Sequence, residues 1–510
     1  RGHARMAQAD APPPRPTSLL PLAVLAVSVG YALKEIDYKA LGVYARDRFV
    51  GPEVLTEPEG CIRLTGPIGA EDAVVLDGAP PIIIAGELDA GVHEFTNLNE
   101  HGTSASTSPR GALWTLDRLS DPTPRLTRLE VPLPEGVTTM HTHGLGLHGN
   151  VLFAINHAFR GGGERIERWL VTRTDGGDAD APPVKLKHVG SVTGHGGDAR
   201  GVGAWTFTSR LNAAINDIAP IGPHEWFMTQ FLDAPASLEG GGSGELFGYE
   251  AEPESAPAAA LRSVGDRLGV PIQAKTVLRR LRRSRVWHCY CAAGAEVEAD
   301  IDSDEPLGST CHRTACEPIG PNSTCWNGIT YKRLNASAAA AINDEEGARP
   351  PHGLLFVNDI FRRVVTEFAV RGSGAGARLS ERRTFQAPYL VDNVHVDATD
   401  GESLWVGAVG VSHNSMFNGL AALRAKAAAA FISSSDDVPR PHTHLRPSAD
   451  APPDPAMGAG ALRIDLRTGT VSTQLLQYAQ LASISWSHGI GGKLFMGSPW
   501  DDGILVCPAA

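Results

Sequence analysis

Adjacent pairs of oxygen-bearing side chains, flanked by short apolar runs, constrain this chain more than any other feature of its sequence. The pair Asp392-Asn393 lies between Leu390-Val391 and Val394. Similar positions occur upstream, at Glu71-Asp72, at Asn216-Asp217 and, with a single donor, at Asn327. Because neighbouring residues on a strand point to opposite faces, each pair can serve two sites at different depths. Carboxylate and amide oxygens are hard ligands, and calcium takes about six to eight of them. The sequence therefore predicts two buried calcium ions.

Short apolar runs between turn-forming residues indicate an all-β fold. Glycine (56) and proline (37) are abundant, as expected where turns are frequent. The clearest runs are 73–76, 81–84, 151–155, 353–357 and 493–497. A chain of 510 residues exceeds one average domain, but closed β architectures form long single domains. Because no residue-level repeat is evident, internal periodicity does not give the number of repeated units.

The net charge of −12 argues against nucleic-acid binding, which needs a basic surface. The arginine-rich segment 279–283 is the exception, and we interpret it as a solvated helix face rather than a patch for a membrane or an anionic partner. We therefore expect a small-molecule substrate and no nucleic-acid partner.

The N-terminal segment 1–34 has the layout of a signal sequence. Arg1, Arg5 and Arg15 precede an uncharged stretch from residue 16 to residue 33. Its length is at the short edge for a membrane span, which needs roughly 20 residues. We favour a retained signal-anchor over a cleaved peptide, with a buried core helix as the third reading, and we treat 35–60 as a linker. The expected location is the secretory pathway, either extracellular or in the lumen of the endoplasmic reticulum.

Seven cysteines suit an oxidising compartment and leave at least one thiol unpaired or intermolecular. Five of them are clustered, at positions 289, 291, 311, 316 and 325. With His288 and His312 nearby a zinc site is an alternative, but no C-x-x-C pair supports it, so local disulfides are favoured. The sequons at Asn322 and Asn335 are candidate glycosylation sites.

Further segments lie between the oxygen pairs: Arg110–Trp114, His143–Gly146, Ala154–His157 and Ile221–Phe227. In this order, the separated blocks from Gly60-Cys61 to Leu505–Cys507 resemble the paraoxonase/arylesterase family of calcium-dependent hydrolases. The resemblance implies a six-bladed β-propeller over 61–507, closed by its N- and C-terminal strands, with two calcium ions stacked in a central tunnel. It also implies a disulfide between Cys61 and Cys507, which would stabilise by about 4–5 kcal/mol as an upper estimate.

Carried over residue by residue, the resemblance assigns ligands to both calcium ions. The upper, catalytic ion would take Glu71, Asn216, Asn327, Asp392 and Asn393. The lower, structural ion would take Asp72, Asp217 and the backbone carbonyl of Leu145. Each ion then receives two carboxylates, which neutralise a divalent charge as burial requires.

The resemblance also implies a histidine pair that activates water, with His143 as the general base and His157 behind it. Imidazole suits this role because its ordinary pKa lies near 6.5. The alternative for His143 is a structural, hydrogen-bonding role. His141 and His148 are close in sequence, but His143 directly precedes Gly144-Leu145, which the lower ion would need.

Three stretches are predicted to be helical or disordered insertions in propeller loops, at about 174–183, 234–318 and 420–455. Within the second, residues 252–283 begin as a Pro/Ala-rich linker and continue with helical spacing of apolar residues. Family members carry a helix near this place that contacts membranes or lipoproteins, so the resemblance implies a lipid surface as a further partner, together with the N-terminal segment.

The chain departs from the family at the wall of the pocket. It has Gln230-Phe231-Leu232 where the family has Asn-Asp-His, and Ala408-Val409 where many relatives have Cys-His. The segment after Gly86 also lacks the expected tyrosine. The predicted function is hydrolysis of aryl esters or lactones, with organophosphate hydrolysis implied only by the family name. The alternatives are a non-catalytic calcium-binding scaffold and a strictosidine-synthase-like or gluconolactonase-like propeller. A serine hydrolase is disfavoured because no G-x-S-x-G motif occurs.

Overall fold

The computed structural model describes the strands and the turns that join many of them. The described residues are 60–88, 112–135, 137, 140–158, 163–174, 181–193, 215–230, 284–291, 314–323, 325–342, 349–360, 362–410, 459–477, 481, 483–499 and 501–509. The predicted N-terminal segment 1–34, the linker up to residue 59 and the helix at 252–283 lie outside them. All of the insertion at 420–455 and most of the one at 174–183 also lie outside them.

The described strands form six four-stranded antiparallel sheets. Blade 1 contains β2 (Ala70–Leu76), β3 (Ile82–Glu87), β4 (Leu113–Asp117) and β5 (Arg125–Arg128). Blade 2 contains β6 (Thr142–His148), β7 (Val151–Ala158), β8 (Gly163–Arg173) and β9 (Val184–Thr193). Blade 3 contains β10 (Ile215–Gly222), β11 (Glu225–Gln230), β12 (Ser284–Cys291) and β13 (Thr314–Ser323).

Blade 4 contains β14 (Trp326–Arg333), β15 (Gly353–Asp359), β16 (Val364–Arg371) and β17 (Arg378–Gln386). Blade 5 contains β18 (Leu390–Val396), β19 (Ser403–Gly410), β20 (Ala459–Asp465) and β21 (Val471–Gln477). Blade 6 contains β22 (Trp486–Ile490), β23 (Lys493–Gly497), β24 (Asp502–Pro508) and the N-terminal strand β1 (Ile62–Ile68). The helix α7 (Ala336–Ala341) and the 3-10 turn η2 (Gly374–Gly376) lie in loops of blade 4.

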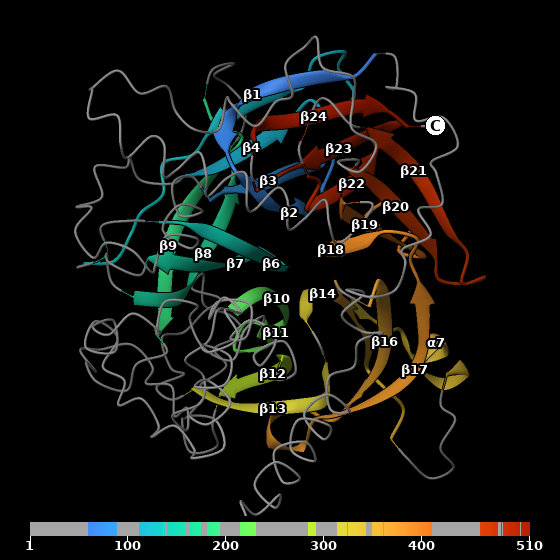
Figure 1. Ribbon diagram of the computed structural model, residues 1–510. Coiled ribbons are helices and arrows are strands. Elements are labelled where there is room, and N and C mark those ends of the chain that lie inside the picture. Colours follow the sequence, from blue (N-terminus) through green and yellow to red (C-terminus); the bar gives the residue numbers. More distant parts are fainter. Residues whose placement is uncertain are drawn as a thin grey trace, which may run out of the picture. The chain divides into compact units, whose positions relative to one another are not determined.

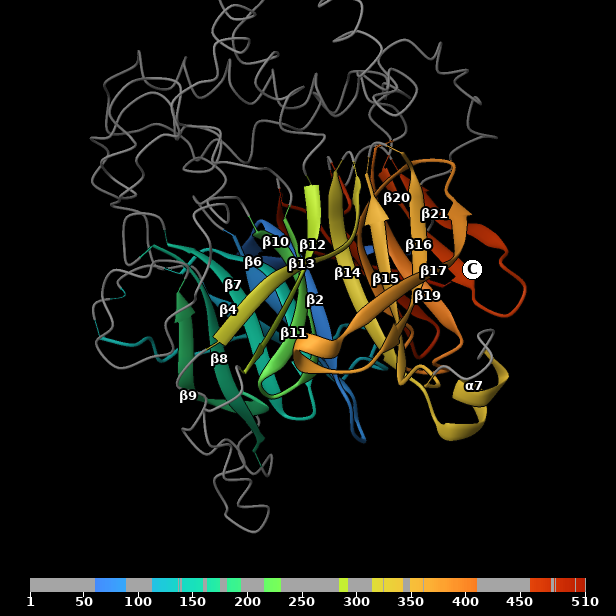
Figure 2. The same cartoon turned by 90° about the horizontal axis from the view of Figure 1, so that it is seen from below.

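The six blades close into a ring. The inner strands contact one another in the order β2, β6, β10, β14, β18, β22 and back to β2, and Figure 1 looks along the axis that they surround. Figure 2 shows the same blades after a quarter turn. The ring is closed by β1, which pairs with β24 through Ile62 opposite Val506. A disulfide joins Cys61 to Cys507 beside this pair. The predicted six-bladed propeller is confirmed, and it has the expected closing disulfide.

Each pair of neighbouring blades shares one apolar core. Six clusters of buried side chains fill the six interfaces. Strand β3 illustrates the pattern, because Ile82 and Ile84 pack toward blade 2 while Ile83 and Ala85 pack toward blade 6. Successive strand residues point to opposite faces of a blade, and the two neighbouring blades cover both of these faces. This is why the strands read as continuous apolar runs rather than alternating ones.

The predicted insertion at 234–318 requires a correction. Strand β12 and the first half of β13 lie within it and complete blade 3. Their cysteines and polar residues suggested a loop, but Cys289 and Cys316 form a disulfide between these two paired strands. Cys291 is also disulfide-bonded, so local disulfides are present in place of zinc ligands. Cys325 is a buried free thiol, and its pKa is raised by burial and by nearby Asp359 and Asp392.

Two surface features were also expected from the sequence. Asn322 is exposed on β13, and Asn335 is exposed at the start of α7, where its side chain accepts a hydrogen bond from the N–H of Ala338. Of the helices that the structure describes, none combines the length and the apolar character of a membrane span.

The closing disulfide should contribute more to stability than the one inside blade 3. Cys61 and Cys507 are separated by 446 residues, and Cys289 and Cys316 by 27. In the chain-entropy model the difference in separation corresponds to about 2.5 kcal/mol. We expect Cys61→Ala/Cys507→Ala to lower the free energy of unfolding by about 2–5 kcal/mol in a denaturant titration. The matched control is Cys289→Ala/Cys316→Ala; an equal or larger loss in the control would contradict the prediction.

Candidate metal centre

Five of the six inner strands carry a β-bulge at the same level of the tunnel. In β2, Ala70 and Ala73 pair with Glu87 and Ala85, so three steps on one strand match two on the other. The same shift occurs in β6, β10, β14 and β18, whereas β22 pairs with β23 in regular register. The residues inside the five bulges are Glu71-Asp72, His143-Gly144, Asn216-Asp217, Asn327-Gly328 and Asp392-Asn393. Bulges redirect side chains, and here they bring the predicted residues to the tunnel axis.

The five predicted ligands of the upper ion lie together and are buried. Asn393 Nδ2 donates to Glu71 Oε1 at 3.1 Å, and Asp392 is hydrogen-bonded to the side chain of Asn327. Asn216 is linked to the same group through His143, whose Nε2 lies 3.4 Å from Asn216 Nδ2. We call these five residues the upper layer.

Four oxygens of the upper layer make no hydrogen bond: Glu71 Oε2, Asn216 Oδ1, Asn327 Oδ1 and Asn393 Oδ1. A buried acceptor without a partner costs about 1–3 kcal/mol. Four of them in one layer, from four different blades, form a donor set made only of oxygen. Carboxylate and amide oxygens of this kind fit calcium. Among the described residues, no three His, Cys, Asp or Glu side chains gather into a metal-binding group. A calcium site here would therefore depend on the amide oxygens of the three asparagines as well as on the carboxylates.

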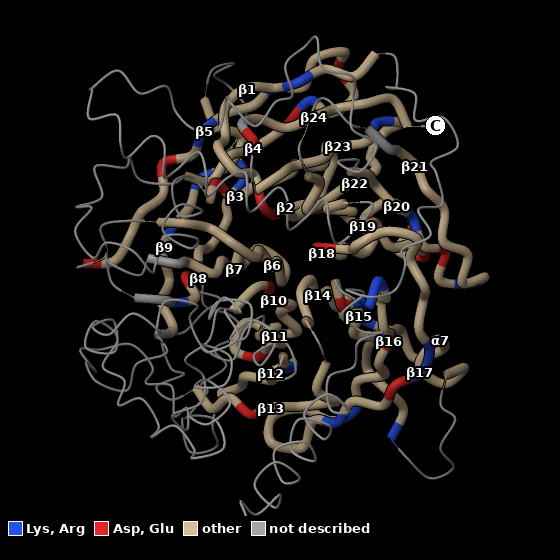
Figure 3. Tube along the Cα trace, viewed as in Figure 1, with Lys and Arg blue, Asp and Glu red and all other residues tan. Residues whose placement is uncertain are grey.

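The charge of the tunnel also favours a cation. Burial raises the pKa of Asp392 well above its ordinary value, and repulsion from Glu71, Asp72 and Asp217 raises it further. Burial and then Glu71 raise the pKa of Asp72 in the same way. The six inner strands contain no Lys or Arg except Lys332 and Arg333, at the far end of β14. Figure 3 shows acidic residues on β2 and β18 where these strands approach the axis.

The predicted lower ligands, Asp72 and Asp217, differ from the upper layer because their oxygens are hydrogen-bonded. Asp72 accepts from Ala73 N–H at 2.8 Å and from Leu145 N–H at 2.6 Å. Asp217 accepts from Ile218 N–H and Ile329 N–H, both at 2.7 Å. Each carboxylate therefore joins its own inner strand to that of the next blade. Leu145 takes part through its N–H, and the predicted role of its carbonyl stays a prediction.

Two glycines allow the inner strands to approach so closely. A Cβ on Gly144 would lie within 2.6 Å of Asp217 Oδ1, and one on Gly328 would lie 2.5 Å from the Cα of Asn393. Any other residue in these bulges would push the neighbouring blade away. The glycines thus bring the Asp217 carboxylate and the Asp392-Asn393 pair to the axis.

His143 is the histidine that reaches the upper layer. Its Nε2 lies 3.2 Å from Glu71 Oε1. His141 is buried elsewhere, with Nδ1 3.3 Å from the carbonyl of Leu88. His148 lies at the other end of β6, where burial and Arg333 lower its pKa. The proposed partner His157 lies in β7 opposite Glu164, but its side chain is outside the described part of the chain.

Two histidines close to Asp72 and Ala73 were not singled out from the sequence. The ring of His395 lies 4.5 Å from that of His488, and His395 Nε2 is 3.0 Å from Asp72 Oδ1. Burial lowers the pKa of His395 to about 4; burial and the neighbouring His395 lower the pKa of His488 to about 3. Both rings are therefore neutral at physiological pH.

Sequence reasoning also missed the residues that face the bulges. Thr229 accepts from Asp217 N–H at 3.1 Å and donates to the carbonyl of Asn327, and Asn358 accepts from Gly328 N–H at 3.1 Å. Each lies on the second strand of its blade, and a polar residue that ends an apolar run there is the signal that could have found it. Gln230, one of the departures from the family, accepts from Trp287 Nε1 at 2.6 Å. Ala408, another departure, is buried in the core between blades 4 and 5.

No protein-family model matches the chain, and no curated protein matches it. Among solved structures, a candidate 6-phosphogluconolactonase from Bacteroides fragilis is 10% identical, with 77% of this chain and 85% of that chain covered and a TM-score of 0.30. A candidate 6-phosphogluconolactonase from Bacteroides uniformis is 11% identical, with 78% and 87% covered and a TM-score of 0.30. Similarity at this level carries neither fold nor activity over to this chain.

Without a bound cation the protein should be more stable in mild acid than in mild base. Asp72, Asp217 and Asp392 have pKa values above the ordinary 3.8 in the fold. Their contribution to the free energy of unfolding is therefore fully present below about pH 4. It is lost as the pH rises through the raised pKa values of the folded state. In chelator we expect a higher melting temperature at pH 5 than at pH 8, and a smaller difference with calcium.

Asp392→Asn should reduce this pH dependence in chelator, because it removes one of the repelling carboxylates. Asp121→Asn, at an exposed turn, is the matched control. A melting temperature of the parent protein in chelator that stays constant or rises from pH 5 to pH 8 would contradict the electrostatic account.

Proposed function

We propose that this chain is a calcium-dependent hydrolase of aryl esters or lactones, similar to the paraoxonase/arylesterase family. The observation that carries the proposal is the upper layer, in which four buried oxygens without partners and Asp392 lie beside the imidazole of His143. An all-oxygen cation site next to a titratable base is what metal-assisted hydrolysis requires.

The cation would be held by Glu71, Asn216, Asn327, Asp392 and Asn393. Two carboxylates balance a divalent charge, and the three amides add oxygens without adding charge. Calcium bound there would polarise a carbonyl oxygen of the substrate and stabilise the negative charge that develops on it. A second divalent cation would lie against Asp72 and Asp217, where it would offset their repulsion.

His143 would take the proton from the attacking water. A neutral imidazole can accept a proton at Nε2, and the Glu71 carboxylate 3.2 Å away would stabilise the imidazolium that results. Asn393 also holds Glu71 in place, since its Nδ2 donates to both the carbonyl and Oε1 of Glu71. His157 on the adjacent strand β7 remains the proposed partner that would orient His143 or relay its proton.

The disulfides of the described part fit an oxidising, secretory compartment. The substrate class that we propose is a small ester or lactone. Contact with a lipid surface through the N-terminal segment and residues 252–283 stays a prediction from the sequence.

A non-catalytic calcium-binding propeller is the second candidate. The observation that favours it is the use of Gln230 and Ala408 for packing, because relatives place polar groups at these positions. The two candidates agree on the cation and differ on turnover, so a hydrolysis assay separates them.

The first test is hydrolysis of phenyl acetate and a panel of lactones with calcium, with chelator, and with calcium restored. We expect activity that disappears with chelator and returns with calcium. Glu71→Gln and Asp392→Asn should each reduce kcat/KM by at least a hundredfold, because each removes one of the two charges that hold the ion. Asn150→Ala, at an exposed turn, is the control. Full activity in both carboxylate variants would refute the assignment, and calcium binding without turnover would select the scaffold.

His143→Gln separates the base from the ion site. We expect kcat to fall by about 10²–10⁴-fold, the usual contribution of a general base, while calcium affinity in a calorimetric titration changes less than threefold. His148→Gln, at the other end of the same strand, should leave both values unchanged. If His143→Gln loses calcium together with activity, then His143 has a structural role instead.

A further inference from the structure

The bulge that carries Asn327 has its backbone held by side chains from outside its own strand. The N–H groups of the residues on either side donate to Ser284 Oγ at 2.6 Å and to Asn358 Oδ1 at 3.1 Å. The carbonyl of Asn327 itself accepts a hydrogen bond from the hydroxyl of Thr229. Three consecutive residues are thus fixed through their backbone, while the side-chain Oδ1 of Asn327 makes no hydrogen bond.

Thr229 is the member of this set that connects the two depths of the tunnel. Its Oγ1 accepts from the N–H of Asp217 at 3.1 Å and donates to the carbonyl of Asn327. A hydroxyl has a single proton, and here that proton is directed to Asn327. Thr229 is fully buried in blade 3, whereas Asn327 belongs to blade 4. The hydroxyl therefore joins an upper ligand of one blade to the backbone of a lower carboxylate in the neighbouring blade.

Thr229 faces the bulge of its own blade, at a position that is occupied by glycine in two other blades. Gly86 and Gly407 face the bulges of blades 1 and 5. A Cβ on Gly86 would lie 2.6 Å from Thr142 Cγ2, and one on Gly407 would overlap the carbonyl of Ser485. In blade 3 the same position holds a polar side chain that reaches the next blade. Thr229 therefore holds the neighbouring bulge as well as filling space.

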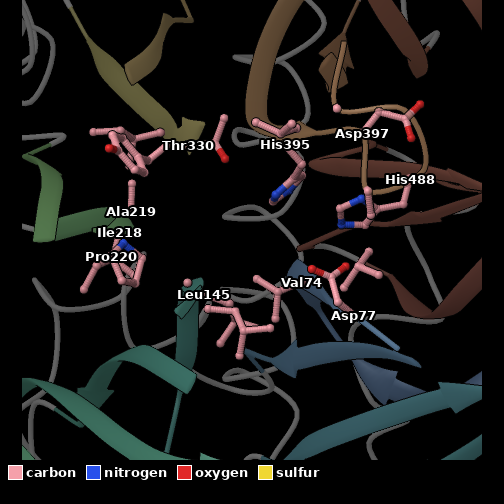
Figure 4. Close-up of a pocket in the computed structure, with 18 of the residues that line it drawn as sticks. Val74, Asp77, Leu145, Ile218, Ala219, Pro220, Thr330, His395, Asp397 and His488 are labelled. Atoms are coloured by element: carbon pink, nitrogen blue, oxygen red, sulfur yellow. The ribbon is translucent and has the colours of Figure 1, made fainter. Parts of the chain in front are cut away.

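The tunnel beside this seam is hollow. A cavity of about 530 Å³ lies there, and Figure 4 shows Ile218 and Ala219 of β10 and Thr330 of β14 on the same side of it. Because residues of both strands line the cavity, β10 and β14 do not pack against a filled tunnel at this level. Support for the bulge of β14 has to come from the blades, where Thr229 lies on β11.

The position of Asn327 matters because its oxygen belongs to a neutral amide. Partners that orient metal ligands typically change metal affinity by about 10–100-fold when they are removed. Without the hydroxyl of Thr229, the buried carbonyl of Asn327 would lose its donor, which is costly in a buried site. The bulge would then shift toward another donor, and the amide oxygen would move with it.

We propose that Thr229 is a positioning residue of the upper cation site: its hydroxyl holds the backbone of Asn327 so that the amide oxygen points to the ion. The inference rests on the proposed function, because it concerns the cation of the upper layer. Thr229 would set the affinity for this cation without touching it.

The test compares calcium affinities by calorimetric titration of the full chain after chelation, and the upper ion is identified as the binding event that Asp392→Asn removes. Thr229→Val keeps the shape of the side chain but has no hydroxyl, and we expect it to weaken this event by at least tenfold. Thr229→Ser keeps the hydroxyl and should stay within threefold of the parent. The matched control is Thr115→Val, which removes a buried hydroxyl that donates to the carbonyl of Thr127 at 3.3 Å in blade 1. It should leave the calcium affinity unchanged.

A loss smaller than tenfold in Thr229→Val would overturn the inference and leave the proposed function intact, whereas a parent chain that binds no calcium would overturn both. An equal loss in Thr229→Ser would also contradict the inference, because the methyl group rather than the hydroxyl would then matter. If Thr229→Val does not fold, Thr229→Cys takes its place, since a thiol is a weaker donor of similar size. We expect at least a threefold loss in that variant, and an affinity equal to that of the parent would refute the role.

Discussion

Mutual repulsion among four buried carboxylates at the axis is the constraint on which this structure depends. Burial and neighbouring charges raise the pKa values of Asp72, Asp217 and Asp392, and Glu71 contributes to all three. Asp72 and Asp217 accept backbone hydrogen bonds that join neighbouring inner strands, whereas Glu71 Oε2 makes no hydrogen bond. Protonation of the carboxyl groups would relieve this repulsion, and so would the cations that we propose to bind at the bulges.

The two depths of the tunnel satisfy their oxygens in different ways. At the lower depth, backbone N–H groups of neighbouring blades bind Asp72 and Asp217, so these carboxylates hold the ring together. At the upper depth, oxygens of four residues are left without donors. Because the hydrogen bonds of Asp72 and Asp217 stabilise the ring at the lower depth, the ring tolerates buried oxygens without hydrogen-bond donors at the upper depth. Preorganised oxygens without donors are what a binding site needs.

The propeller was predicted from the order of the family-like blocks, not from a repeat in the sequence. The adjacent oxygen donors inside apolar runs predicted the residues that the structure brings together in the upper layer. The sequence was not sufficient for the boundaries of blade 3, since the cysteines and polar residues of β12 and β13 obscured their strand pattern. Thr229 and Asn358 were missed because their role is to bind backbone groups that only the bulges expose. His395 was overlooked because its neighbour Asp72 lies more than 300 positions away, and no local pattern joins them.

If cations fill both depths, as we propose, the charges of the two depths would make their binding interdependent. When all four carboxyl groups are ionised they carry four negative charges, and one divalent ion would leave two of these charges uncompensated. The second ion therefore still meets net attraction, although it is repelled by the first. Because Glu71 and Asp72 are adjacent on β2, filling either depth removes part of the repulsion that the other carboxylate feels. On the proposed assignment, the first ion would bind more tightly than the second, and the occupancy of the lower depth would change the affinity of the upper one.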